Sequence, residues 1–120
     1  MAIQIDEYLR ADGSNPYKAW FDTLEAQAAA KVTTAKLRLE LGNTSSVKWF
    51  AGMGEYVIDW GPGLRIYLAQ DGERLIVLFG GGTKRGQQRD IDTAKALLDE
   101  YKARKKSINA NATQLRKRKK

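Results

Sequence analysis

The 120-residue sequence contains no cysteine and no histidine, and these two absences exclude several classes of site. Without cysteine there is neither a disulfide framework nor a thiolate nucleophile. Without histidine, the usual zinc sites and every catalytic pairing of serine or cysteine with histidine are excluded too. No apolar run approaches the ~20 residues that a membrane span needs, and the amino terminus does not resemble a signal peptide. We therefore expect a single-domain cytoplasmic protein that holds no metal and does not contact a membrane.

Acidic residues are missing from the end of the chain, and this decides how the net charge of +7 is interpreted. Nine of the 21 basic residues and none of the 14 acidic residues lie in residues 102–120, which leaves 12 basic and 14 acidic residues in 1–101, a formal charge of −2. We divide the chain into one domain, residues 1–106, and a basic tail, residues 107–120. The tail is small and polar, with isolated Ile108 and Leu115, so we expect it to be disordered or only marginally helical.

The first part of the chain predicts a strand followed by two helices. Residues 3–9 alternate apolar and polar side chains imperfectly, as a strand does. Asn15 followed by Pro16 is typical of a helix N-cap and the first helical position. Residues 26–41 are rich in alanine and end at Gly42, which predicts a second helix. The first helix has one apolar stripe, formed by Tyr17, Trp20, Phe21 and Leu24.

The middle of the chain predicts a sheet made of hairpins. The expected strands are residues 47–50, 55–60, 64–69 and 74–79. Residues 61–63 (Gly-Pro-Gly) and the Asp71-Gly72 pair are turn sequences, because glycine permits positive φ and proline cannot donate to a strand ladder. Because side chains alternate along a strand, Arg65 and Tyr67 must share one face of this sheet.

Three glycines, residues 80–82, follow the last predicted strand and lead into a basic loop, residues 83–89. Their spacing fits neither of the common phosphate-binding loops, so we expect no nucleotide or other small-molecule cofactor. The glycines instead predict a flexible break that lets the basic loop approach a ligand backbone. Asp90 is typical of an N-cap for a last helix. The apolar stripe of that helix is Ile91, Ala94, Leu98 and Tyr101.

Roughly residues 3–101 resemble the phage-derived killer-protein branch of the RelE/ParE toxin superfamily, akin to HigB-type toxins. Two segments at the family's spacing carry the resemblance, G-P-G-x-R-[IV]-Y at residues 61–67 and G-G-x-K-x-x-Q-x-x-D-I at residues 81–91. Glu55 and Ile58-Asp59 before the turn also match. The resemblance implies an α+β, RelE-like fold, in which an N-terminal strand and a helical hairpin pack on a mostly antiparallel sheet with a C-terminal helix.

The resemblance also implies a function. Proteins of this kind are toxins of type II toxin–antitoxin modules, which cut mRNA in the ribosomal A site, inhibit translation and are silenced by a helix-turn-helix antitoxin. The expected activity is therefore that of a metal-independent endoribonuclease, or mRNA interferase. The expected partners are the ribosome, mRNA and a cognate antitoxin.

Cleavage of RNA by its own 2′-hydroxyl needs a base, an acid for the leaving oxygen, and cations for the charge that develops on phosphate. Without histidine, these roles fall to Lys, Arg, Glu or Tyr. Arg65 and Lys84 are the candidate phosphate clamps, with Tyr67 on the same sheet face as Arg65. Lys48 matches a lysine that is usual in the family and is the candidate general base. Glu55 is the alternative base.

Other residues are candidates for RNA binding through phosphate contacts, which give affinity without sequence information. They are Lys31 and Arg38 on the second helix, and Arg85, Gln87 and Arg89 in the basic loop. Structural alternatives stay open for several of them. The basic helix face would be simply solvated, Arg65 would pair with Glu55 or Asp59, and Gln87 would cap the loop. The carboxylate pairs, Glu55 with Asp59 and Asp71 with Glu73, are expected to be solvated surface.

One position departs from the family pattern. Val57 stands where an arginine that binds phosphate is usual, so the chain would be a weak toxin, or Arg85 or Arg38 would substitute. Two other functions therefore stay open. The first is a ParE-like DNA gyrase inhibitor without nuclease activity, and the second is a weakened toxin kept for antitoxin binding and operon autoregulation. The basic character of the loop and of the C-terminal segment favours RNA over gyrase.

Overall fold

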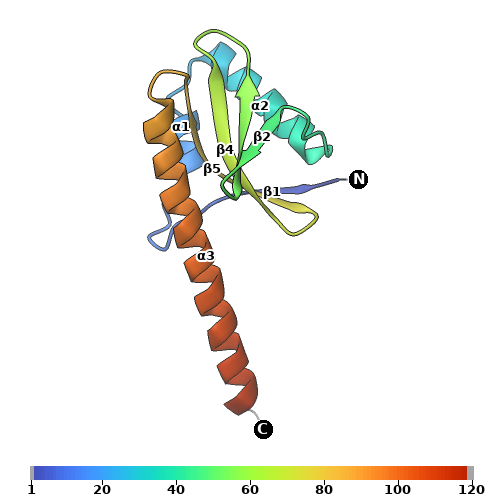
Figure 1. Cartoon of the computed structure of the whole chain (residues 1–120), viewed down its shortest axis with the longest axis vertical. Coiled ribbons are helices and arrows are strands. Elements are labelled where there is room, and N and C mark those ends of the chain that lie inside the picture. Colours follow the sequence, from blue (N-terminus) through green and yellow to red (C-terminus); the bar gives the residue numbers. More distant parts are fainter. Residues whose placement is uncertain (1, 119–120) are drawn as a thin grey trace.

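The computed structural model describes the backbone of residues 2–118 and the side chains of residues 2–110. Within these residues, five strands form one sheet, with helices on both of its faces (Figure 1). In chain order the elements are β1 (Gln4–Glu7), α1 (Pro16–Phe21), α2 (Ala26–Glu40), β2 (Val47–Phe50), β3 (Met53–Ile58), β4 (Leu64–Asp71), β5 (Leu75–Gly82) and α3 (Gln87–Arg118). The α+β class and the order of the elements agree with the sequence analysis.

The strand order in the sheet is β1-β5-β4-β3-β2. Strands β2 to β5 form an antiparallel meander, whereas β1 joins β5 in parallel. The expectation of a mostly antiparallel sheet is confirmed. β1 and β2 are the two edge strands, and both are only four residues long. Short edge strands leave few unpaired backbone groups exposed.

Each face of the sheet has its own core. On one face, α1 and α2 pack on alternate residues of β3, β4 and β5, such as Tyr56, Ile66 and Leu78. On the other face, α3 packs on the intervening residues, such as Tyr67 and Phe79. β4 is therefore buried on both sides, because it lies in the centre of the sheet with helices above and below.

The ends of α1 and α2 follow the capping signals in the sequence. The side chain of Asn15 accepts a hydrogen bond of 3.0 Å from the backbone N–H of Lys18, and Pro16 is the first residue of α1. This confirms the predicted N-cap. α2 ends at Glu40, one residue before the predicted end, and Gly42 has a φ of +88°, a conformation that favours glycine.

The prediction of a break at residues 80–82 is wrong, because β5 continues through Gly82. Gly81 and Gly82 pair with Ile66 and Arg65 of β4. A Cβ atom on Gly81 would lie 2.5 Å from the ring of Trp20, and one on Gly82 would lie 2.1 Å from Oδ2 of Asp90. These glycines thus allow α1 and the start of α3 to approach the two faces of β5 closely, rather than making the chain flexible.

The last helix also differs from the prediction at both ends. α3 begins at Gln87, so Asp90 lies in its first turn instead of capping it. It runs to Arg118, so the boundary predicted between residues 106 and 107 falls inside one helix, and the tail, expected to be disordered or marginally helical, has a helical backbone as far as it is described. No glycine or proline follows Gly86, and alanine, lysine, arginine and glutamine favour helix. In the part of the chain that the structure describes, no helix is both long and apolar enough to cross a membrane.

Candidate functional site

Strand register brings the candidate catalytic residues of the sheet together on the face that packs against α3. Lys48 of β2 lies opposite Glu55 of β3, which lies opposite Tyr67 of β4. In the next row, Val57 lies opposite Arg65. Directly opposed residues point to the same face of an antiparallel pair, so these five side chains share one face of the sheet.

Arg65 and Glu55 form a buried ion pair at the centre of this face. Nε of Arg65 lies 3.6 Å from Oε2 of Glu55, and the two side chains are only 11% and 4% exposed. Nη1 of Arg65 also donates a hydrogen bond of 2.6 Å to the carbonyl of Gly63. The sequence left open whether Arg65 pairs with Glu55, and the structure confirms this pair. The expectation that Glu55 is solvated is wrong, because Glu55 shares the face of β3 that carries Met53, and this face is covered by α3.

Gln87, in the first turn of α3, closes the cluster. Its Nε2 donates a hydrogen bond of 2.7 Å to the same Oε2 atom of Glu55. The carboxylate therefore links β3, β4 and α3. As placed here, Gln87 is engaged within the protein, so this residue serves the position of Glu55 and Arg65 rather than direct contact with RNA.

Tyr67 is buried next to this pair. Its hydroxyl lies beside the Glu55 carboxylate and forms no hydrogen bond of regular geometry with another described residue. Burial, and then the negative charge of Glu55, raise the pKa of Tyr67 well above its ordinary value. Tyr67 therefore stays protonated at neutral pH and, as placed here, does not reach solvent.

Four cations surround the buried cluster without joining it. Lys48 lies exposed on the edge strand β2, and Lys84, Arg85 and Arg89 lie exposed in the loop before α3 and in its first turn. None of these four side chains forms a hydrogen bond or ion pair with another described residue. Their charges are thus available to a ligand.

The loop that carries Lys84 is held over the Gly-Pro-Gly turn. The backbone N–H of Lys84 donates to the carbonyl of Pro62 at 3.3 Å. A Cβ atom on Gly63, whose φ is +76°, would lie 3.0 Å from Nη1 of Arg65 and 3.6 Å from Cβ of Lys84. Because Gly63 has no side chain, the guanidinium of Arg65 and the Cβ atom of Lys84 can both lie close to this turn.

The two basic candidates of α2 lie elsewhere. Lys31 and Arg38 line a hollow of about 360 Å³ between α2 and the end of β3 that extends beyond β2. Val57 and Trp60 line the same hollow. Of the two arginines considered as substitutes at position 57, Arg38 therefore shares a hollow with Val57. Arg85 lies in the loop before α3.

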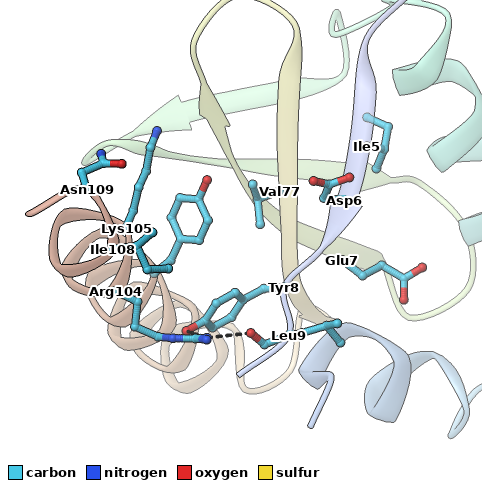
Figure 2. Close-up of a pocket in the computed structure, with 11 residues that line it drawn as sticks. Ile5, Asp6, Glu7, Tyr8, Leu9, Val77, Arg104, Lys105, Ile108 and Asn109 are labelled. Atoms are coloured by element: carbon cyan, nitrogen blue, oxygen red, sulfur yellow. Dashed lines mark hydrogen bonds between the residues drawn. The ribbon is translucent and has the colours of Figure 1, made fainter. Parts of the chain in front are cut away.

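A larger hollow, of about 580 Å³, lies between β1 and the middle of α3, at some distance along α3 from the cluster around Arg65. Figure 2 shows the guanidinium of Arg104 beside the ring of Tyr8 and its hydrogen bond to the carbonyl of Leu9. The guanidinium carbon of Arg104 lies 5.7 Å from the centroid of that ring. Sequence reasoning singled out neither this hollow nor the one near Trp60, because both depend on which helix face meets which strand edge.

The arrangement defines the chemistry that the site can perform. Among the described residues, no group of three or more carboxylate, histidine or cysteine side chains is placed to hold a metal ion. Exposed cations beside a buried arginine can bind phosphate and stabilise negative charge that develops on it. Of the five candidate catalytic residues, Lys48 and Lys84 are exposed, whereas Glu55, Arg65 and Tyr67 are buried together.

Comparison with known proteins finds a relative of this chain. No protein-family model and no solved structure matches the chain. The chain is 36% identical over 102 residues to a protein of Haemophilus influenzae that is described as uncharacterized, and the match covers 83% of this chain and 97% of that protein. The chain therefore belongs to the same family as this Haemophilus influenzae protein.

Proposed function

We propose that this protein is the toxin of a type II toxin–antitoxin module and acts as a ribosome-dependent mRNA endonuclease. One observation carries the proposal. The backbone of Lys84 is held over the Gly-Pro-Gly turn, so its exposed side chain starts from a point close to the guanidinium of Arg65. An exposed lysine that starts beside an arginine, with further cations in the same loop, is suited to a single phosphate in an RNA chain.

The chemistry assigned to each residue follows from its exposure. Lys84 binds the scissile phosphate through its exposed ammonium group. Nη2 of Arg65 forms no hydrogen bond with a described residue, so it can donate to the same phosphate. Lys48, exposed at the sheet edge, is the candidate group for proton transfer with the 2′-hydroxyl. Proton transfer by a positioned side chain contributes roughly 10²–10⁴ in rate.

In this proposal Glu55 does not act as a general base. Its carboxylate is almost fully covered and is occupied by Gln87 and Arg65. It is therefore a positioning residue, which holds the guanidinium of Arg65 at the mouth of the site. Tyr67 is buried beside Glu55 and belongs to the same cluster.

The family assignment and the partners belong to the same proposal. The α+β fold, the mostly antiparallel sheet and the C-terminal helix are compatible with a RelE-like fold, and they support membership of the RelE/ParE superfamily without being specific to it. The partners would be the ribosome, mRNA and a cognate helix-turn-helix antitoxin. No small-molecule cofactor enters the mechanism.

A second candidate is a weakened toxin retained for antitoxin binding and operon autoregulation. Two observations favour it. Val57 places no charge on the sheet face beside Arg65, and Arg65 itself is largely covered. Both reduce the positive charge that the site offers to a phosphate.

The proposal is tested by inducing the protein in a bacterial host and mapping mRNA breaks by primer extension. Wild-type protein should give breaks in phase with codons. Lys84→Ala should reduce them roughly 10²–10³-fold, as expected when one donor to the transition state is removed. Arg74→Ala is the matched control, because Arg74 is an exposed cation at the opposite end of β5, and it should cut like the wild type.

Each other outcome has a defined meaning. Breaks that persist unchanged in Lys84→Ala would contradict the assigned site. Intact mRNA together with stalled gyrase–DNA complexes would favour the ParE-like alternative. Intact mRNA with normal growth, but with antitoxin still bound, would favour the weakened toxin.

A further inference from the structure

The outer part of α3 has the highest density of positive charge in the molecule. We define the basic arm as residues 102–118, the last part of α3. Residues 102–120 contain nine of the 21 basic residues and no acidic residue, whereas residues 1–101 have a formal charge of −2. The net charge of the protein thus comes from this segment, and nothing in the proposed cleavage site uses it.

The base of the arm is fixed to the body at two places. Asp71, the last residue of β4, accepts hydrogen bonds from Tyr101 and from Nζ of Lys105, the latter at 2.6 Å. On the side of β1, Nη1 of Arg104 donates to the carbonyl of Leu9 at 2.7 Å. These contacts, some of which are seen in Figure 2, fix the direction in which the helix leaves the body.

Beyond these contacts, the arm leaves the sheet as a helix as far as Arg118. Figure 1 shows its lower half running away from the sheet with no other element beside it. At 1.5 Å per residue, residues 102–118 span about 25 Å. The long dimension of the molecule, 59 Å, reflects this projection.

Two of the four cations in residues 102–106 form no side-chain hydrogen bond or ion pair with a described residue. Arg104 is engaged by the Leu9 carbonyl and Lys105 by Asp71. Lys102 and Lys106 are exposed and form no ion pair with a described residue. Arg116, Lys117, Arg118, Lys119 and Lys120 follow without any acidic residue nearby in the sequence. Such a run repels itself unless an external anion neutralises it.

We propose that the basic arm is a second nucleic-acid contact, which binds the phosphate backbone of RNA away from the cleavage site. A bilayer is a poorer partner, because Ile108 and Leu115 are the only large apolar residues in residues 102–120 and cannot form an apolar face. Lysine and arginine contacts with phosphates bind without regard to sequence. The choice of RNA over DNA rests on the proposed function; the recognition of phosphate does not.

The test measures binding without cleavage. A fluorescent 2′-O-methyl oligonucleotide lacks the 2′-hydroxyl nucleophile, so its fluorescence anisotropy reports affinity whether or not the protein is a nuclease. We compare the full chain with a variant in which the last five cations, residues 116–120, are changed to glutamine. Each phosphate contact on a single strand contributes about 0.7 to the slope of log K against log salt, so the slope should fall by up to ~3.5. An unchanged slope would overturn the proposal.

Two double variants that remove the same number of cations distinguish binding by the arm from an effect of net charge. Arg116→Gln/Arg118→Gln removes two cations from the arm, and Lys18→Gln/Arg74→Gln removes two exposed cations from the body. Only the first pair should lower the slope, by about 1.4. Equal losses in the two pairs would mean that only net charge matters and would contradict a specific role for the arm.

Two further probes identify the partner. A DNA oligonucleotide of the same sequence should bind in the same salt-dependent way and lose affinity in the same arm variants, because the phosphates are shared. Vesicles that contain an anionic phospholipid should bind more weakly than the oligonucleotide. Tighter binding to vesicles would overturn the proposal in favour of a membrane surface. Normal mRNA cleavage by the arm variants would leave the cleavage proposal intact, whatever the arm result.

Discussion

Cationic side chains have different surroundings at the two ends of α3. At its first turn, Gln87 helps to hold Glu55 against the covered guanidinium of Arg65, inside the protein. At its outer end, cations follow one another with no acidic residue nearby in the sequence and with no other element of the fold beside the helix. Beside the first turn, one cation is therefore built into the fold, whereas the cations of the outer end belong to a segment that projects from it.

This difference predicts where mutations will act. A buried charge that loses its partner costs several kcal/mol, because water cannot replace the partner. An exposed charge is already solvated, and its removal leaves folding almost unchanged. Changes near the sheet should therefore affect stability first, and changes in the arm should affect binding only.

The largest effect is expected for Arg65→Ala. This change leaves the Glu55 carboxylate buried without its cation, so we expect a loss of about 3–5 kcal/mol in the free energy of unfolding. Urea denaturation at neutral pH measures it. The matched control Arg74→Ala removes an exposed arginine and should change stability by less than about 0.5 kcal/mol. A loss of stability for Arg65→Ala as small as that for Arg74→Ala would mean that the Glu55–Arg65 pair is solvated.

A smaller loss in the free energy of unfolding is expected for Gly82→Ala. The added Cβ atom would lie 2.1 Å from Oδ2 of Asp90, so the Asp90 side chain or the start of α3 must shift. Overpacking of this kind typically costs about 1–3 kcal/mol. Asp90→Ala removes the clashing carboxylate, so the double variant should be more stable than the sum of the two single changes predicts. Strict additivity of the two losses would show that the close approach of α3 to β5 does not depend on Gly82.

Asp71→Asn tests the link at the base of the arm. The hydrogen bond from Lys105, and then that from Tyr101, lower the pKa of Asp71 below its ordinary value of 3.8. A carboxyl group with a lowered pKa stabilises the fold above its unfolded pKa, and this contribution is lost as pH falls through the folded value. We expect Asp71→Asn to cost about 1 kcal/mol at pH 7 and progressively less below about pH 3.8. A cost that does not change down to pH 2 would contradict the ion pair.

The smallest effect on folding is expected in the arm itself. Changing the five cations of residues 116–120 to glutamine should alter the free energy of unfolding by less than about 0.5 kcal/mol, because no acidic residue is near them in the sequence and no other element lies beside the outer part of α3. Circular dichroism and urea denaturation measure helix content and stability. A loss above about 1 kcal/mol would mean that the arm packs on the body and is not a free helix.

Much of the fold could be predicted from local patterns in the sequence. Asn15-Pro16 marks the start of α1, and the alternation from Leu64 gives β4 and its two faces. These signals are local, so they can be recognised without knowing which other segments of the chain pack against them. The parallel position of β1 beside β5 is different, because it joins segments about 70 residues apart that carry no pairing signal of their own.

The candidate site was only partly predictable for the same reason. The sequence brings Arg65 and Tyr67 to one face, but the burial of Glu55 depends on the register set by the turn from Asp59 to Gly63. The glycines of β5 were misread because glycine permits both flexibility and close packing, and only the positions of Trp20 and Asp90 distinguish the two. Low apolar content from residue 107 onward left disorder and a marginal helix as alternatives, and helix propensity is the local signal that agrees with a backbone helical to Arg118.

The proposed cleavage of mRNA by attack of the RNA's own 2′-hydroxyl is tested by the chemistry of the new RNA ends. Purified protein is mixed with ribosomes programmed with a short mRNA and an empty A site, and the fragments are analysed by mass spectrometry. Attack by the 2′-hydroxyl should leave a 2′,3′-cyclic phosphate on the upstream fragment, and Lys84→Ala should form it far more slowly. Fragments that end in a 3′-hydroxyl, or intact mRNA in the presence of folded protein, would contradict the account.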